Sequence, residues 1–168
     1  GKKVEIDLVG KDTELDRTVI DALGEPLVHL VRNSLDHGLE TPEERCAAGK
    51  PETGRLEIAA VHAGGGVVIS VSDDGAGIDP QRIGRKAVER GMLAPELADS
   101  LDEAGAAELL FAPGFSTAEE MSDISGRGVG MDAVRSRIRE LGGDVLLRSE
   151  RGRGTRVEVR LPLTLAII

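Results

Sequence analysis

Residues 126–138 read GRGVGMDAVRSRI, in which three alternate glycines run directly into a helical pattern. Glycine backbone approaches an anion closely, and the unpaired N–H groups of a first helical turn point at that anion. No Gly-Lys-Ser/Thr follows, as it would in a Walker loop, and no βαβ unit brackets the glycines as in a dinucleotide fingerprint. The stretch therefore predicts a phosphate site of another type, at the start of a helix from Gly130 to Leu141.

A second long helix is predicted upstream, from Thr18 or Asp21 to His37, with an irregular turn or break near Pro26 and a stop at Gly38. Its apolar residues form one stripe. A polar stripe on the opposite face holds His29, Asn33, Asp36 and His37. Such a stripe is either solvated or part of a site, and beside a glycine-rich phosphate site we interpret it as the latter. The neutral amide oxygen of Asn33 is a ligand type that Mg²⁺ accepts.

The third feature is an acidic turn after a predicted hairpin of strands 56–62 and 67–73. Asp73 ends the second strand and Gly75 and Gly77 follow it. A carboxylate there would accept a hydrogen bond from the adenine amine and reject the guanine carbonyl, while the glycines let backbone pack against the base. An ordinary Asp-Gly turn is the alternative. Thr155 opens the last strand, either to support Asp73 or simply as a strand-favouring residue.

The remaining pattern predicts the fold class. Further strands are expected at 3–9, 145–148 and 155–161, a short helix within 39–53, a helix from Pro80 to about Arg90 and broken helices over 92–110. We predict an α+β domain with one mixed sheet and helices on one face. Residues 111–128 carry both phenylalanines and little periodicity. They are either a lid or a loop that two rings pin to the core.

Composition excludes several functions. The 168 residues suit one domain, which we place at 1–162, with 163–168 as the start of a linker to a following domain. A formal net charge of −9 argues against nucleic-acid or anionic-membrane partners, although a small anion is still accommodated. No apolar run approaches the about 20 residues of a membrane span, and one cysteine allows no internal disulfide. A cytoplasmic setting is expected.

Five short motifs, taken in order, resemble the sequence boxes of the GHKL superfamily. They are HLVRNSLDHG (29–38, N box), DDGAGI (73–78, G1 box), FAPGFST (111–117, F box), GRGVGMD (126–132, G2 box) and GRGT (152–155, last glycine motif). The histidine that opens the N box, the F box and the closing LPLTLAII are similar to the ATP-binding catalytic domain of chemotaxis histidine kinases. The likeness spans nearly the whole chain.

This resemblance implies a Bergerat α/β sandwich, in two layers, that binds Mg-ATP. By matching position it implies that Asn33 ligates the metal, that His29 assists it and that Asp73 and Thr155 lie at the adenine. The resemblance also implies that the nucleotide is lined by glycines 75, 77, 126, 128 and 130. The other candidates are Asp36, His37, Ile78, Arg85, Lys86, Ser125, Gly126, Arg127, Gly128, Val129, Gly130 and Met131, of which His37, Arg85, Lys86 and Arg127 are offered as phosphate neighbours.

Two departures from the family pattern bear on activity. Gyrase-type and Hsp90-type members carry a glutamate as general base four residues before the asparagine, where this chain has His29. No helix pair with a phospho-accepting histidine is visible. The resemblance therefore implies a kinase that phosphorylates a histidine on a separate phosphotransfer domain, in trans, with dimerisation and coupling-protein-binding domains outside this chain. A regulatory module in which ATP only orders 111–128 is the alternative.

Overall fold

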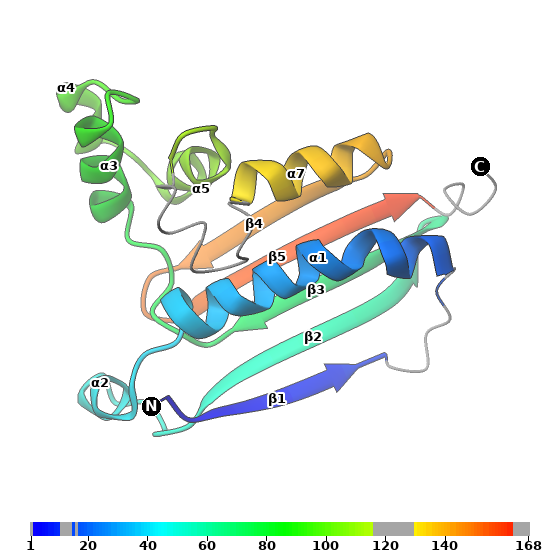
Figure 1. Cartoon of the computed structure of the whole chain (residues 1–168). Helices are drawn as coiled ribbons and strands as arrows, with labels where there is room; N and C mark the ends of the chain where they lie inside the picture. The colour runs from blue at the N-terminus through cyan, green and yellow to red at the C-terminus, as the bar shows by residue number, and fades with distance from the viewer. Residues whose placement is uncertain (1, 11–14, 16, 116–129, 163–168) are drawn as a thin grey trace.

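A computed structural model describes residues 2–10, 15, 17–115 and 130–162 of the chain. They form a five-stranded sheet in the order β1-β2-β3-β5-β4 (Figure 1). The strands are β1 Val4–Val9, β2 Gly54–Ala63, β3 Gly66–Asp73, β4 Asp144–Glu150 and β5 Gly154–Pro162. β1 runs parallel to β2 and the other neighbours are antiparallel, so the predicted mixed sheet is confirmed.

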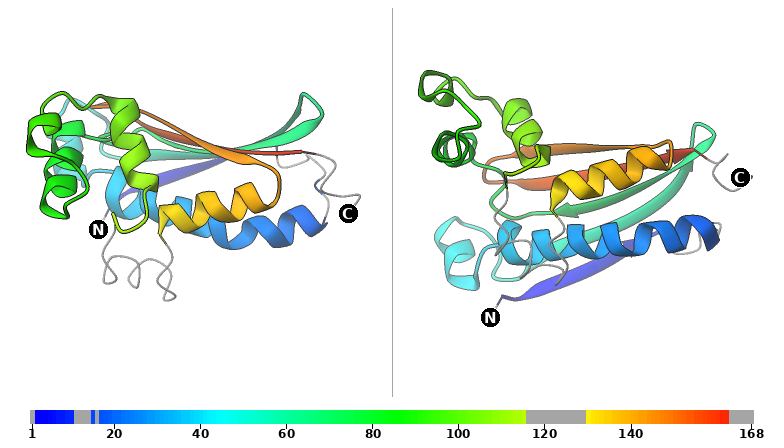
Figure 2. Two further views of the ribbon diagram at one scale, coloured as in Figure 1. Left: turned by 90° about the horizontal axis from the view of Figure 1, so that it is seen from above. Right: turned by 45° about the horizontal axis from the view of Figure 1, so that its top comes forward.

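Helical segments lie on one face of the sheet or beyond its end. They are α1 Arg17–Asn33, the π-helical turn η1 Ser34–Gly38, α2 Pro42–Ala47, α3 Pro80–Glu89, α4 Pro95–Ala98, α5 Glu103–Phe111 and α7 Met131–Glu140. Figure 2 shows α1 and α7 lying on the same face of the sheet, with α3 and α4 beyond its end. The predicted α+β architecture is therefore confirmed. No helix in the described part of the chain is long and apolar enough to cross a membrane.

Local sequence explains several element ends. Gly64 and Gly65 have φ of 56° and 77°, which suits the two-residue turn that joins β2 to β3. Thr41 and Glu44 form a capping box at the start of α2, with reciprocal bonds of 3.2 and 3.1 Å. Gly91, at φ 70°, follows the end of α3. The predicted strands and helix starts at these places are confirmed.

The core lies between the sheet and the two long helices. Alternate residues of β3 and β5 face it, because strand side chains alternate between faces. Its buried members include Val67, Ile69, Val71, Val157, Val159, Leu161, Leu23, Leu30, Val134, Ile138 and Phe111. With no Trp or Tyr in the chain, aliphatic packing supplies nearly all of this burial.

Two expectations for the upstream helix are wrong. α1 runs without a break from Arg17 to Asn33, with Pro26 inside it. The ring of Pro26 is buried, and core contacts of Leu23 and Leu30 on either side outweigh the hydrogen bond that proline removes. The helical run ends at Gly38 as predicted, but Gly38 is not its C′ residue: Ser34–Gly38 widens into a π-turn, Gly38 does not adopt a positive φ, and Leu39 is the C-cap.

Candidate functional site

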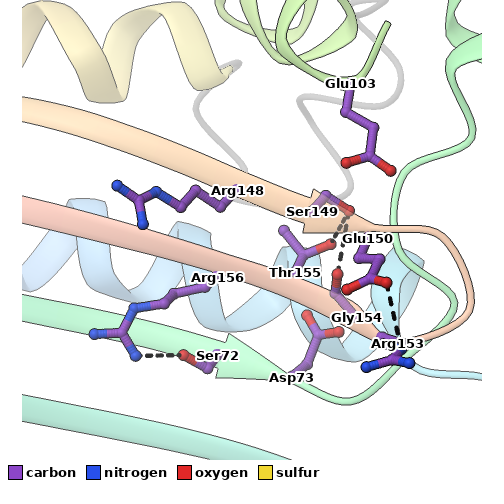
Figure 3. A pocket seen from close by; sticks show the side chains of 10 residues that line it. All are labelled: Ser72, Asp73, Glu103, Arg148, Ser149, Glu150, Arg153, Gly154, Thr155 and Arg156. Carbon is purple, nitrogen blue, oxygen red and sulfur yellow. Dashed lines mark hydrogen bonds and ion pairs between the residues drawn. The ribbon is translucent and has the colours of Figure 1, made fainter.

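Three polar side chains meet where β3 ends and β5 begins. Asp73 pairs in register with Thr155, and Thr155 pairs with Ser149 of β4, so all three lie on the helix-covered face of the sheet. They border an open hollow of about 650 Å³ at this end of the sheet, which is also lined by Ser72, Arg148 and Arg156 from the opposite face (Figure 3). The Thr155 hydroxyl lies 3.1 Å from Ser149 Oγ and bonds that residue, whereas support of Asp73 by this hydroxyl was predicted.

Asp73 is a half-buried carboxylate held by protein donors. The Gly75 N–H donates to Asp73 Oδ1 at 2.9 Å. Burial raises the pKa of Asp73 above its usual range, and hydrogen bonds from Gly75, the Ser34 hydroxyl and the Thr155 backbone act in the opposite direction. Asp73 is therefore an acceptor group beside the hollow, partly desolvated before any ligand arrives.

The glycines of the acidic turn are needed by the protein itself. A side chain at Gly75 would collide with the carbonyl oxygen of Gly38, and one at Gly77 would collide with that of Glu150. Gly77 also has φ of 74°, in the left-handed region. The Ala76 N–H donates to the Gly38 carbonyl at 2.9 Å, which joins the turn to the end of the upstream helix. The close approaches of Gly75 and Gly77 are thus made to two other segments of the chain. Packing of these glycines against a base stays a prediction.

Asn33 lies beside the beginning of α7. Its Nδ2 donates to the sulfur of Met131, the first residue of α7, at 3.1 Å. The N-cap residue of α7 is Gly130, which offers no capping side chain, so the helix start depends on other acceptors. The N-terminus of this ten-residue helix favours negative charge close to it. Asn33 is thus placed where an anion would meet the first turn of α7.

His29, predicted to be a site residue on the polar stripe, is buried. Only 4% of its surface is exposed, and its Nδ1 has no hydrogen-bond partner within the described residues. Because α7 packs across α1, His29 lines a second hollow of about 510 Å³ between these two helices. Burial lowers its pKa, which Asp132 partly offsets, so the imidazole is neutral at pH 7. His37 and Asp36 lie exposed in the π-turn.

The remaining predicted residues lie farther apart. Ile78 donates its N–H to Ser149 Oγ at 2.7 Å and so borders the hollow. Arg85 is exposed on α3, and the Lys86 ammonium stands 4.9 Å from the centre of the Phe115 ring. Ser125, Gly126, Arg127, Gly128 and Val129 lie outside the described residues, as do most of the predicted lid and the tail 163–168.

The start of the predicted lid is anchored by its two rings. Phe111 belongs to the core, with the Arg135 guanidinium 4.7 Å from its ring centre, and Phe115 is 2% exposed, beside Lys86 of α3. For residues 111–115 the structure therefore supports a loop pinned by aromatic side chains. A lid over the rest of this segment, residues 116–128, stays a prediction, since these residues lie outside the described part of the chain.

A magnesium ion fits the donor set only if a ligand supplies most of its oxygens. Within the described ranges no group of three or more His, Cys, Asp or Glu side chains could hold a metal ion. Asn33 offers a neutral oxygen beside the α7 start. Mg²⁺ is commonly held by one or two protein oxygens together with phosphate oxygens, and the residues present match that pattern.

Ser34, Ser149 and Arg45 are site residues that sequence reasoning missed. Ser34 bonds Asp73, and Ser149 bonds both Ile78 and Thr155. The short 150–154 turn between the last two strands was a usable signal for Ser149, because it sets the register that places residue 149 opposite Thr155. Nothing in the local pattern indicated the burial of Arg45.

Residues 19–165 match the family described as histidine kinase-, DNA gyrase B-, and HSP90-like ATPase. The chain therefore belongs to this ATPase family, as the five boxes predicted. Its relatives include the chemotaxis protein CheA of Bacillus subtilis, 53% identical over 167 residues, and that of Salmonella typhimurium, 54% identical over 168 residues. These alignments cover 99% and 100% of this chain but 25% of each relative, so the chain spans about a quarter of their length.

A solved structure shares the fold. The histidine kinase domain of the blue-light activated histidine kinase EL346 from Erythrobacter litoralis superposes with a TM-score of 0.55 at 15% identity. The superposition covers 97% of this chain and 53% of that one. At this identity the likeness concerns the arrangement of sheet and helices, and it confirms the predicted GHKL fold.

Proposed function

We propose that this chain is the ATP-binding catalytic domain of a CheA-like histidine kinase. It binds Mg-ATP at the end of the sheet and transfers the γ-phosphoryl group to a histidine on a separate phosphotransfer domain. One contact carries the proposal: the Asp73 carboxylate lies against Gly38, at the end of the π-turn that follows Asn33, so closely that a Cβ at Gly38 would come within 2.8 Å of Asp73 Oδ2. This contact brings Asp73, which would bind the base, near the segment that carries Asn33, which would bind the metal ion at the phosphates. A nucleotide needs these two kinds of group at its two ends.

Each residue has a separate task in this proposal. Asp73 accepts a hydrogen bond from the adenine amine. Asn33 holds the metal ion together with phosphate oxygens, and the first turn of α7 turns its N–H groups toward the phosphates. Bound Mg²⁺ would neutralise charge on the triphosphate and so help the phosphoryl group leave. The protein's contribution is positioning and electrostatic stabilisation.

Kinase chemistry is favoured over hydrolysis by the state of His29. A general base for water must accept a proton at an accessible nitrogen. His29 is neutral but buried between α1 and α7, and its low pKa makes it a weak base. Dimerisation and coupling-protein-binding domains, and the acceptor histidine itself, are assigned to other parts of the protein, since the chain spans about a quarter of its relatives.

Phosphoryl transfer in trans is the direct test of this function. The 168-residue chain is incubated with radiolabelled ATP and Mg²⁺, alone and with the histidine phosphotransfer domain of the same protein. We expect slow hydrolysis by the chain alone, no stable label on it, and acid-labile label on the partner. Transfer should be slow, since untethered domains lack the effective concentration that a shared chain provides.

One control and three alternative outcomes decide that test. An acceptor domain whose phospho-accepting histidine is replaced by glutamine should take up no label. Rapid phosphate release by the isolated chain would show an ATPase, and label on its own histidines would show a self-contained kinase. Tight ATP binding without any transfer would favour the regulatory module.

ATP binding should weaken as the pH falls, because Asp73 acts as an ionised acceptor. Its raised pKa means that the carboxylate takes up a proton at a higher pH than an ordinary aspartate does, and the protonated form is a poorer acceptor. We expect affinity to be greatest above the raised pKa and to decline as the pH drops through it. Calorimetric titrations from about pH 8 to about pH 5 with wild type and Asp73→Asn would show this.

The ratio of the two affinities is the quantity to follow, because protonation of ATP itself cancels in it. The ratio of wild-type to Asp73→Asn affinity should shrink toward low pH. A ratio that stays constant across the same pH range would contradict ionised Asp73 as the acceptor.

A further inference from the structure

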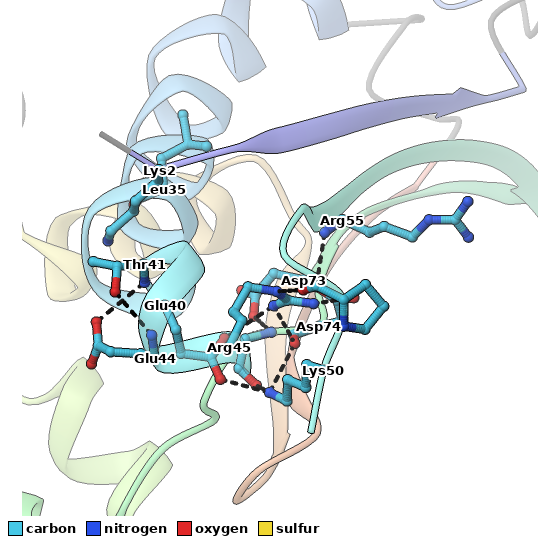
Figure 4. A network of polar contacts seen from close by, with 12 residues as sticks. Lys2, Leu35, Glu40, Thr41, Glu44, Arg45, Lys50, Arg55, Asp73 and Asp74 are labelled. Carbon is cyan, nitrogen blue, oxygen red and sulfur yellow. Dashed lines mark hydrogen bonds and ion pairs between the residues drawn. The ribbon is translucent and has the colours of Figure 1, made fainter. Parts of the chain in front are cut away.

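A buried arginine lies next to the acidic turn that follows Asp73. Arg45 of α2 is 1% exposed, although arginine is almost never fully buried unless it is paired. Its Nε donates to the Pro51 carbonyl at 2.7 Å, its Nη1 to Glu40 Oε1 at 3.0 Å and its Nη2 to Asp74 Oδ2 at 3.1 Å. Figure 4 shows the Arg45 side chain close to Glu40 and Asp74.

Arg45 and its neighbour Lys50 also bind the main chain that follows Asp73. Arg45 Nη1 also donates to the Asp74 carbonyl at 3.2 Å. The Lys50 ammonium donates to that carbonyl at 3.1 Å and to the Gly75 carbonyl at 2.8 Å, and it pairs with Glu40 Oε2 at 2.7 Å. Two cations thus balance two carboxylates, and between them they bind consecutive carbonyls of one turn (Figure 4).

The position of the Asp73 carboxylate depends on this turn. The Gly75 N–H that donates to Asp73 belongs to the peptide unit between Asp74 and Gly75, whose carbonyl oxygen both cations bind. On its other side the turn is held by the bond from Ala76 to Gly38 and by the Arg55 N–H, which donates to Asp74 Oδ1 at 2.8 Å. A small shift of this peptide unit moves the donor that orients Asp73.

A gain in folding stability alone does not explain why an arginine is buried at this position. Removing two charges from water costs about as much as their attraction returns, so a buried ion pair often contributes no more than an apolar side chain of similar size. A planar guanidinium with several fixed donors specifies geometry instead. Arg45 holds four acceptors from three chain segments at once, which an apolar side chain would not do.

We propose that Arg45 is a positioning residue for base recognition: together with Lys50 it holds the turn after Asp73 and thereby sets the preference for adenine over guanine. This inference rests on the proposed function, in which Asp73 reads the base. Arg45 touches no nucleotide in this arrangement. It acts through the main chain between Asp73 and Ala76.

The test compares ATP and GTP affinities in three variants of the 168-residue chain. Arg45→Lys keeps the positive charge but cannot reach all four acceptors. Lys50→Met removes the donors to both carbonyls at a side chain that is 17% exposed, and it serves as the second variant if Arg45→Lys fails to fold. Arg55→Gln is the matched control. The backbone N–H of residue 55 still binds Asp74 in this variant, and the side chain that is changed is 66% exposed.

For Arg45→Lys and Lys50→Met we expect ATP affinity to fall about tenfold, since misplacement by a fraction of an ångström is costly at a preorganised site. GTP affinity should change less than about twofold, so the ATP/GTP ratio falls about tenfold. In acceptor labelling, KM for ATP should rise while kcat is retained. Arg55→Gln should keep the wild-type ratio, and thermal melting should show each compared variant folded.

The inference and the proposed function fail in different ways. If wild type prefers ATP and a folded Arg45→Lys or Lys50→Met keeps that preference, the positioning role is overturned and the function stands. Equal losses of ATP and GTP affinity would show a purely structural role and overturn it as well. If wild type binds neither nucleotide, the proposed function falls and the inference falls with it.

Discussion

Replacing Asn33 with alanine is expected to slow phosphoryl transfer about 100-fold or more, since a catalytic metal ion supplies several kcal/mol of charge stabilisation and each 1.4 kcal/mol is about a factor of ten. The variant should still fold. Asn33 is half-buried and its side-chain amide donates to the Met131 sulfur, a contact whose loss costs about 1 kcal/mol. The measurement is the initial rate of acceptor labelling at saturating ATP, with Mg²⁺ varied.

Asn33→Asp is the matched control, because it preserves an oxygen at the same place. It should retain much more of the rate than alanine and should respond to Mg²⁺ concentration. A thermal melt of both variants separates lost chemistry from lost folding. If Asn33→Ala labels the acceptor within about threefold of wild type, a loss of under about 1 kcal/mol, Asn33 does not bind the metal.

Replacing Asp73 with asparagine is expected to weaken ATP binding by about 2–4 kcal/mol, because the adenine amine loses a charged acceptor and a buried polar group is left mismatched. That is about 30-fold to 1,000-fold in Kd. GTP binding should stay weak and nearly unchanged, since guanine presents a carbonyl at that position. Calorimetry with both nucleotides measures the difference.

Glu103→Gln is the control for this second substitution. Glu103 of α5 lines the same hollow but is exposed and bonded to none of the turn residues in the described part of the site (Figure 3). The substitution removes one negative charge and leaves the residues proposed to bind the base unchanged, so ATP affinity should change less than about twofold. Equal wild-type affinity for ATP and GTP would contradict the role of Asp73.

The local pattern of the chain was sufficient for most of the elements. Alternation of apolar residues predicts both strands of the β2–β3 hairpin, and Gly64-Gly65 predicts its turn. The capping residues Thr41 and Glu44 predict the start of α2. These signals are local because backbone geometry and the faces of a strand or helix depend on residues a few positions apart.

The class of site was also accessible from the sequence, as a set of motifs in order. Asp73 and Thr155 lie side by side at the ends of their strands, and Asn33 lies beside the start of α7. Their partners were not accessible. Thr155 turns to Ser149, and Asp73 takes the Ser34 hydroxyl, because strand register and the π-turn decide which polar atoms meet.

The burial of two charged or polar side chains was decided by the tertiary structure. Arg45 follows two glutamates in a short helix and has the pattern of a solvated charge, yet the acidic turn, Glu40 and Pro51 close around it. His29 belongs to a polar stripe in the sequence, and α7 covers it. The sequence by itself determined the elements, the family and the kinds of chemical group. Which groups lose water and which atoms pair depended on segments far apart in the chain, whose packing no local period encodes.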